Sequence, residues 1–312
     1  MAAPAYTAGC FGKLPLAADF LQHQTGGAAA RAFLHWCEEG VHLLAERRGA
    51  ETGDLLSRMP ALGFVFPDTR SNEFLVGRMI PGRDASGRRF PFSAFLRGSG
   101  WKSLSFGASP LAFENFFAHA DRLLSSNPAD VAAFLEGIDA LHATAPPAGA
   151  LDPHAFERSL AGREVGPEKT IEAAERQLAR LAARGRQFPG YALRFPLPAG
   201  TPPEAWASFW LGLAERAFGR LPAAAIWGAR SDGAPSGARE SGSGPSLPAY
   251  LDLIPEPYDR IAFLHLADPG FESERLMTLA EDSNAPPSRT LESTTDLADF
   301  WREAVARLEG AR

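Results

Sequence analysis

The chain of 312 residues is poor in cysteine and has no long apolar run. Cysteine occurs only at Cys10 and Cys37, without the C-x-x-C spacing of a metal site or a redox pair. No stretch reaches the roughly 18 apolar residues of a membrane helix. Residues 1–9 lack the basic and apolar regions of a secretion signal. The sequence therefore predicts a cytoplasmic protein with two reduced, buried thiols, no membrane insertion, no bound metal and no cofactor.

Positive charge is also in short supply. Lysine and arginine number 31 against 37 aspartate and glutamate residues, which gives a formal net charge of -6. Bulk binding of nucleic acid needs a basic surface, so we expect no nucleic-acid partner. One segment departs from this balance, because its arginines outnumber its carboxylates (Arg70, Arg78, Arg83, Arg88, Arg89 and Arg97 against Asp68, Glu73 and Asp84).

Familiar catalytic motifs are missing as well. Gly12-Lys13 suggests a phosphate-binding loop, but that motif needs Gly where Thr7 stands and Ser or Thr where Leu14 stands. No G-x-S-x-G nucleophile elbow occurs. These absences favour a binding protein over an enzyme.

The segment from Ala28 to Arg48 has the apolar spacing of an amphipathic helix. Its apolar stripe is predicted to face the core (Ala30, Phe33, Leu34, Cys37, Val41 and Leu44). Trp36 and Leu43 lie on the flank of this stripe and are expected at the edge of the core, with contact to a partner protein as the alternative. The opposite face is predicted to be solvated rather than to hold a metal ion (His35, Glu39, His42 and Glu46).

Strand-like and helix-like segments alternate along the chain. Strands are predicted over residues 5–11, 62–66, 74–80, 90–96, 191–197, 223–227, 249–254 and 261–266. Helices are predicted over residues 28–48, 109–124, 127–140, 167–184, 202–218 and 295–308. This interleaving favours an α/β fold in which helices cover a central sheet. The hairpin-like unit at 74–96 indicates that the sheet is mixed.

The chain divides into three regions by pattern. Residues 5–145 form an N-terminal region that carries two short motifs. Residues 146–270 are predicted to form a C-terminal α/β region that packs on or completes the same sheet. Within it, residues 229–247 are rich in Gly, Ser and Pro without periodicity, which predicts a flexible loop. Residues 271–312 form a tail with a terminal helix.

The two short motifs have the composition of tight turns at strand ends. The first holds Gly12, Lys13, Pro15, Asp19 and Phe20, and the second holds Pro81, Asp84, Gly87, Arg88, Arg89, Phe90 and Pro91. A turn aspartate commonly accepts hydrogen bonds from nearby backbone N–H groups, so a structural role is expected for Asp19 and Asp84. Lys13, Arg88 and Arg89 would form an anion- or partner-binding surface. For the two arginines, ordinary surface exposure is the open alternative.

The two motifs resemble the signature segments of the TagF (ImpM) family of type VI secretion accessory proteins. The family patterns are approximately G-F-F/Y-G-K-L-P-x-x-G-D-F and P-S-x-D-x-x-G-R-x-F-P-L. The matching residues are Gly9, Phe11, Gly12, Lys13, Leu14, Pro15, Asp19, Phe20, Pro81, Asp84, Gly87, Arg88, Phe90 and Pro91. Ala18 stands where the family usually has Gly, and Gly82 where it usually has Ser. The resemblance covers mainly residues 5–100, within a TagF-like N-terminal region.

The resemblance implies a three-layer α/β sandwich and a regulatory function without catalysis. TagF proteins act in the cytoplasm as post-translational repressors of the type VI secretion apparatus, and they are thought to bind a forkhead-associated scaffold protein of that system. Two alternatives stay open. One is a phosphate-handling or hydrolytic enzyme that uses Asp19, Asp84 and Arg88, and the other is a structural component of the secretion apparatus.

Overall fold

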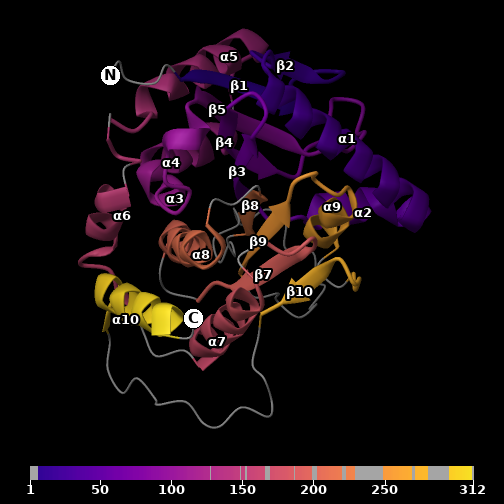
Figure 1. Cartoon of the computed structure of the whole chain (residues 1–312). Coiled ribbons are helices and arrows are strands. Elements are labelled where there is room, and N and C mark those ends of the chain that lie inside the picture. Colours follow the sequence, from indigo (N-terminus) through magenta and orange to yellow (C-terminus); the bar gives the residue numbers. More distant parts are fainter. Residues whose placement is uncertain are drawn as a thin grey trace.

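The fold centres on a mixed β-sheet of nine strands (Figure 1). The computed structural model describes residues 6–126, 128–147, 149–151, 153–165, 169–185, 187–198, 202–219, 223–228, 249–268, 271–279 and 295–310. The strands follow the order β10-β7-β9-β8-β3-β4-β5-β1-β2. Adjacent strands are antiparallel except β10 and β7, which run parallel. Their bounds are β1 Thr7–Gly12, β2 Leu21–His23, β3 Leu62–Asp68, β4 Glu73–Ile80, β5 Phe92–Ser99, β7 Ala192–Pro196, β8 Ala223–Gly228, β9 Tyr250–Pro255 and β10 Leu276–Thr278.

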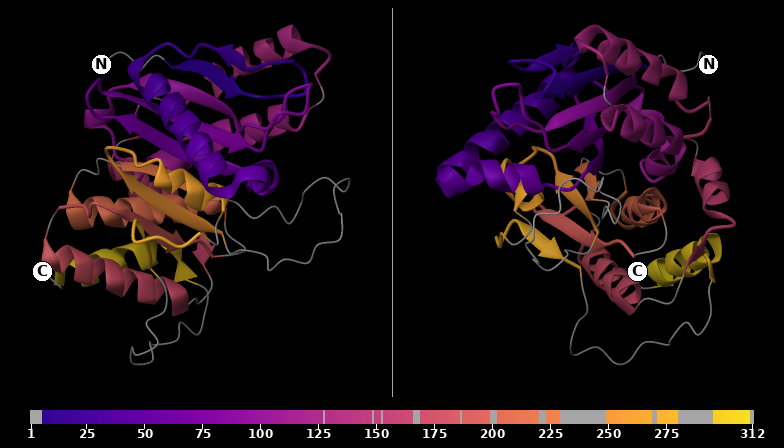
Figure 2. Two further views of the ribbon diagram at one scale, coloured as in Figure 1. Left: turned by 90° about the vertical axis from the view of Figure 1, so that its right-hand side faces the viewer. Right: turned by 180° about the vertical axis from the view of Figure 1, so that it is seen from behind.

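Helices cover both faces of this sheet (Figure 2). One face carries α1 (Ala28–Arg48), α2 (Thr52–Arg58) and α9 (Ile261–Ala267). The other carries α3 (Ser109–Ala112), α4 (Glu114–Leu124), α5 (Val131–Ala140), α6 (Pro153–Leu160), α7 (Lys169–Arg184), α8 (Pro203–Phe218) and α10 (Leu297–Gly310). A separate pair of short strands joins β6 (Glu164–Val165) to β11 (Thr295–Asp296). The three-layer α/β sandwich is therefore confirmed.

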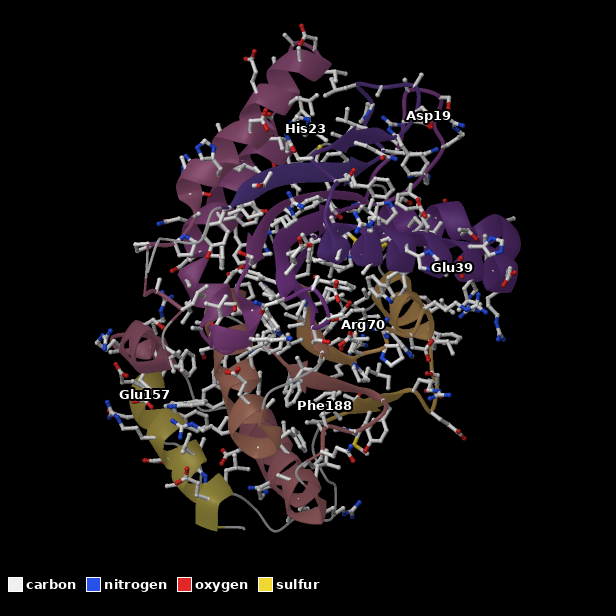
Figure 3. The ribbon with its side chains drawn as sticks, turned by 45° about the horizontal axis from the view of Figure 1, so that its top comes forward. Asp19, His23, Glu39, Arg70, Glu157 and Phe188 are labelled. Carbon is white, nitrogen blue, oxygen red and sulfur yellow. The ribbon has the colours of Figure 1, made fainter. Side chains whose placement is uncertain are left out.

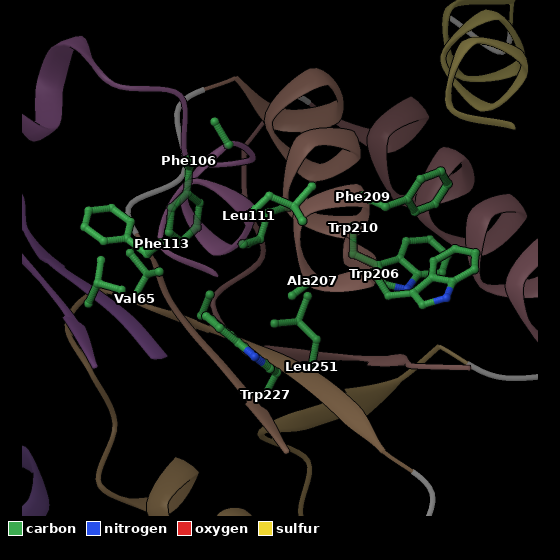
Figure 4. Close-up of a cluster of buried hydrophobic side chains, with 14 of the residues drawn as sticks. Val65, Phe106, Leu111, Phe113, Trp206, Ala207, Phe209, Trp210, Trp227 and Leu251 are labelled. Carbon is green, nitrogen blue, oxygen red and sulfur yellow. The ribbon is translucent and has the colours of Figure 1, made fainter. Parts of the chain in front are cut away.

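The alternation of side chains along each strand builds two cores. In β3, Phe64 and Phe66 pack beneath α1, whereas Val65 faces the opposite helix layer. Both faces of the central strands are buried, so these strands read as continuous apolar runs in the sequence. The larger core lies beneath α8, where Trp206, Phe209 and Trp210 cluster with residues of β8 and β9 (Figure 4).

Helix α1 has the predicted bounds and a wider buried face than predicted. Trp36 and Leu43 are buried together with Phe33. The cause is α9, which packs along α1 at Gly40, where an added Cβ would lie 2.3 Å from the Phe263 ring. At the start of α1 no local side chain caps the helix, and Glu73 of β4 instead accepts hydrogen bonds from its first N–H groups at 2.6 and 3.1 Å.

The strand predicted over residues 261–266 is wrong, because this segment is helix α9. Its six residues are almost all apolar, and a short apolar run does not distinguish a buried strand from a buried helix. The helix predicted over 109–124 is broken at Phe113 into α3 and α4. The helix predicted from residue 127 begins at Val131, where the Asp130 carboxylate accepts a hydrogen bond from the Ala133 N–H group at 2.9 Å.

Several short elements carried no clear signal in the sequence. These are β2, β6, β10, β11, α2 and α6. The loop predicted at 229–247 lies outside the described residues. Strands from residues 7–99 and from residues 192–278 lie in one continuous sheet, joined where β3 pairs with β8. In the part of the chain that the structure describes, every helix is too short or too polar to cross a bilayer.

Candidate functional site: the paired turns

The two sequence motifs lie side by side at one end of the sheet. Residues 12–20 lead from β1 to β2, and residues 81–91 lead from β4 to β5. Because β1 and β5 are neighbouring strands, with Phe11 opposite Ser93, the two loops meet. Ala85 donates a backbone hydrogen bond to the Ala17 carbonyl at 2.8 Å. We call residues 12–20 and 81–91 the paired turns. Figure 3 places Asp19 in this loop region, away from Arg70.

A buried ion pair joins the two turns. The Lys13 ammonium lies 2.9 Å from Asp84 Oδ2, and the two residues are only 6% and 2% exposed. Asp84 Oδ1 also accepts hydrogen bonds from the Ser86 N–H and hydroxyl groups, at 3.0 and 2.7 Å. Burial by itself would raise the pKa of Asp84, but the hydrogen bonds from Ser86, Lys13 and Arg88 hold it far below its usual range. Asp84 is therefore an ionised structural centre of the second turn.

Arg88 binds Asp84 from the solvent-exposed side of the paired turns. Its Nε donates to Asp84 Oδ2 at 2.8 Å, and its Nη2 donates to the Ala18 carbonyl at 2.7 Å. Asp19 Oδ1 lies 3.6 Å from the same Nη2. The guanidinium thus links both turns and still leaves 57% of the Arg88 side chain exposed. Arg88 therefore joins the two loops through its contacts with Ala18 and Asp84.

Glycine is required where the turns change direction. Gly12 has a φ of +132°, and an added Cβ would lie 2.2 Å from the Pro91 carbonyl oxygen. Gly82 has no room for a Cβ either, since it would lie 2.4 Å from the carbonyl oxygens of Lys13 and Phe90. Gly87 has a φ of +87° but lies in open space. Lack of space for a Cβ therefore requires glycine at positions 12 and 82, whereas the positive φ alone favours glycine at position 87.

Three phenylalanine rings lie beneath and beside the ion pair. Phe20 stacks on Phe11 with the ring centroids 5.3 Å apart, and it meets the edge of Phe90 at 4.9 Å. The Lys13 ammonium lies 4.8 Å from the centroid of the Phe20 ring. Phe11 and Phe90 are buried, and Phe20 is 37% exposed.

The sequence model of a family described as the TagF N-terminal domain, type VI secretion system-associated, matches residues 9–141. Residues 9–141 belong to the TagF family. The match includes both motifs and confirms the resemblance drawn from them. Residues 9–141 therefore form a domain of a type VI secretion system-associated family.

One solved structure shows that the fold extends beyond the family match. The crystal structure of PA0076 from Pseudomonas aeruginosa PAO1 is similar with a TM-score of 0.51 and 19% sequence identity, over 87% of this chain and 98% of that chain. At this identity the likeness concerns the fold alone. No curated protein matches the chain.

In the TagF region, the structure separates the site residues that the sequence grouped together. Lys13 is buried against Asp84, so it contributes no exposed charge to the predicted surface. Arg88 and Arg89 are exposed, as is Arg83, which lies opposite Arg89 in an antiparallel bridge. Pro15 and Asp19 are exposed as well, while Pro81 is half-buried and Pro91 is buried.

The basic segment between residues 68 and 97 is not one surface. Arg78 is buried in β4 and forms a bidentate ion pair with Asp121 at 2.8 Å, while Glu204 of α8 lies 3.1 Å away. The Arg78 guanidinium also lies 4.8 Å from the centroid of the Phe117 ring. Sequence reasoning missed this network. A lone arginine inside an otherwise apolar strand was the available signal.

A second feature that the sequence did not reveal is a groove beside α1. It has a volume of about 530 Å³ and is bordered by Trp36, Tyr258, Arg70 and the ion pair between Glu39 and Arg260. The indole N–H of Trp36 donates to the Asp259 carbonyl at 3.0 Å.

Among the described residues, no group of three or more His, Cys, Asp or Glu side chains could hold a metal ion. Cys10 and Cys37 are buried and free, and burial raises the pKa of Cys10 to about 12.

Proposed function

We propose that this protein is a cytoplasmic, post-translational repressor of the type VI secretion system. It acts by binding a protein of that system, and the partner we propose is its forkhead-associated scaffold. Repression then follows from occupancy, because a scaffold held by this protein is withheld from the apparatus. The support for the repressor role is membership of the TagF family.

The main support for a binding role is the arrangement of charged groups in the paired turns, where some are buried in internal contacts and others are exposed. Both Asp84 carboxylate oxygens are occupied by internal hydrogen bonds, and Lys13 is buried against them. These groups make the turns rigid, and rigid loops lose little conformational freedom when a partner binds. The exposed charged groups are the guanidinium groups of Arg83, Arg88 and Arg89 and the carboxylate of Asp19. We therefore propose a protein-docking role for this end of the sheet in place of catalysis.

Affinity purification of the full chain from its native host tests this proposal. The scaffold is expected among the retained proteins, and overproduction of the chain is expected to reduce secretion. Retention of sheath or baseplate proteins without the scaffold would instead support a structural component of the apparatus.

A thermal-shift screen with nucleotides and divalent metals tests the enzyme alternative. A ligand at about 100 times its dissociation constant stabilises the folded state by roughly 2.7 kcal/mol. Such a shift, lost on substitution of Asp19 or Arg88, would contradict a purely binding role.

A further inference from the structure

Phe20 is unusual among the large apolar side chains of this protein. Of those in the described part of the chain, only Phe20 and Met277 are exposed, at 37% and 39%. Met277 lies on the edge strand β10, whereas Phe20 belongs to the paired turns. A partly exposed aromatic ring at a family-signature position is a candidate for contact with another protein, because aromatic residues are enriched in protein interfaces.

The Phe20 ring is held in place before any partner arrives. Phe11 stacks on it at an interplanar angle of 14°, and the Phe90 ring meets it edge-on at 72°. Both supporting rings are buried. A side chain that is already fixed loses little rotamer entropy on binding, and aromatic and arginine residues dominate the binding energy of many interfaces.

The exposed residues of the paired turns are mostly small or cationic, and the exception is Asp19, whose Oδ1 accepts a hydrogen bond from the Phe20 N–H group at 2.8 Å. Pro15, Ala18, Ala85, Ser86 and Gly87 are exposed and have short side chains. Arg88 is anchored beside them through its hydrogen bond to the Ala18 carbonyl. The Phe20 ring thus lies on a surface that combines short side chains with the guanidinium groups of Arg83, Arg88 and Arg89.

The charge of this region selects the chemistry of the partner. The paired turns hold four cations (Lys13, Arg83, Arg88 and Arg89) against two carboxylates (Asp19 and Asp84), in a chain whose net charge is -6. Lys13 and Asp84 neutralise one another in the interior, so the exposed balance is positive. Complementary charge directs an acidic surface here and disfavours a basic one.

We propose that Phe20 is the apolar anchor of a docking surface on the paired turns, and that its partner is a protein segment in which acidic residues flank a large apolar side chain. The partner's apolar group packs on the exposed part of the Phe20 ring, and its carboxylates pair with Arg88 and the neighbouring arginines. The identity of the partner rests on the proposed function, whereas its chemistry rests on these residues.

Calorimetry of the full chain with the purified scaffold tests the proposed partner and the role of Phe20 separately. Where the wild-type protein binds, Phe20→Ala is expected to weaken affinity at least tenfold, and the matched control Met277→Ala is expected to bind as the wild type does. Raising salt from 50 to 500 mM is expected to weaken wild-type binding several-fold. Wild-type affinity in Phe20→Ala, or an affinity independent of salt, overturns the inference and leaves the proposed function standing.

The Phe20→Ala variant also loses contacts with Phe11 and Phe90, so its fold is checked by circular dichroism. If it does not fold, Phe20→Leu tests whether Phe20 anchors the partner, since leucine keeps apolar volume over the Phe11 and Phe90 rings. We expect it to bind at least threefold more weakly than the wild type, and unchanged binding overturns the inference.

If the wild-type protein does not bind the scaffold, the proposed function fails and the inference is decided by photo-crosslinking in host cells. The photoreactive residue p-benzoylphenylalanine replaces Phe20, or Met277 as the control, and mass spectrometry identifies the crosslinked peptide. A crosslink from position 20, and not from 277, to an acidic segment with a large apolar residue supports the inference. A crosslink to a neutral or basic segment, or none from position 20, overturns it.

Discussion

Arg78 Nη2 and Glu204 Oε1 lie 3.1 Å apart in the interior, and they join β4 of the TagF region to α8, which lies beyond it. Both side chains are less than a tenth exposed. Removing Glu204 takes away the buried carboxylate partner of Arg78 and leaves its ion pair with Asp121, whose side chain is 46% exposed. This ion pair and the pairing of β3 with β8 both connect the two halves of the chain.

Glu204→Ala should therefore destabilise the whole protein. We expect a loss of about 2 kcal/mol in the free energy of unfolding, measured by urea denaturation, because a buried hydrogen bond between charged groups is lost. The matched control is Glu157→Ala, because Glu157 pairs with Arg216 at 3.5 Å on the surface, where the expected loss is below about 1 kcal/mol. Equal losses in the two variants would contradict a structural role for the buried network.

Asp84 should make the fold sensitive to acid. Its pKa in the folded protein lies below the unfolded value of about 3.9. Such a group stabilises the fold above that pH, and the stabilisation is lost as the pH falls. In Asp84→Asn, the decline in unfolding free energy between about pH 5 and pH 2 should be shallower than in the wild type. Asp54→Asn, at an exposed position on α2, should keep the wild-type slope, and an unchanged slope in Asp84→Asn would refute the assignment.

Gly12 and Gly87 form a matched pair for testing the turn geometry. Gly87→Ala should cost about 1 kcal/mol, because only the left-handed backbone opposes it. Gly12→Ala should cost about 3 kcal/mol or more, because the new Cβ also meets the Pro91 carbonyl and the Phe92 backbone. Thermal unfolding of both variants measures the difference, and similar losses would show that the two turns do not approach as closely as described.

His265 should control how firmly β10 is attached. Its Nδ1 lies 2.9 Å from the Phe271 carbonyl oxygen and its Nε2 lies 2.8 Å from the Ser273 hydroxyl, so the neutral ring donates to the first and accepts from the second. Burial lowers the pKa of His265, against the opposing effect of Asp252, while Arg194 adds to the lowering. The contacts of the neutral ring therefore stabilise the fold above about pH 6.5 and weaken as the pH falls.

Hydrogen exchange at pH 7.5 and pH 5.5 tests this attachment. After correction for intrinsic rates, the amides of Leu276–Thr278 should lose protection at pH 5.5, while those of β4 should not. His265→Asn should remove this pH dependence. Constant protection of β10 across this range in the wild type would contradict the account.

Periodicity in the sequence predicted most helices and strands, but not which charged side chains are buried. The bounds of α1 follow from its spacing of apolar residues, and those of β3 and β4 follow closely from theirs. The burial of Lys13 and Arg78 depends on partners that lie 71 and 126 residues away, at Asp84 and Glu204, and no local pattern encodes such a pairing. The same limit applies to α9, whose apolar run fits a strand or a helix until its neighbours are known.

Family motifs located the candidate site, and the structure divided its residues by role. Gly12, Lys13 and Asp84 build the turns, whereas Phe20, Arg88 and Arg89 are exposed on them. A composition of glycine, proline and charge predicts a polar turn, but it does not say which charge is turned inward. The burial of Phe90 and the partial exposure of Phe20 likewise depend on how the two loops meet.

The measurement that tests the central claim most directly is calorimetry of the full chain with the forkhead-associated scaffold of the same secretion system. Arg83→Glu combined with Arg89→Glu reverses two exposed charges and leaves the Lys13–Asp84–Arg88 network in place. We expect the wild type to bind and this variant to bind at least tenfold more weakly, with Arg302→Glu on α10 binding as the wild type does. Unchanged affinity in the Arg83/Arg89 variant would contradict docking through the paired turns.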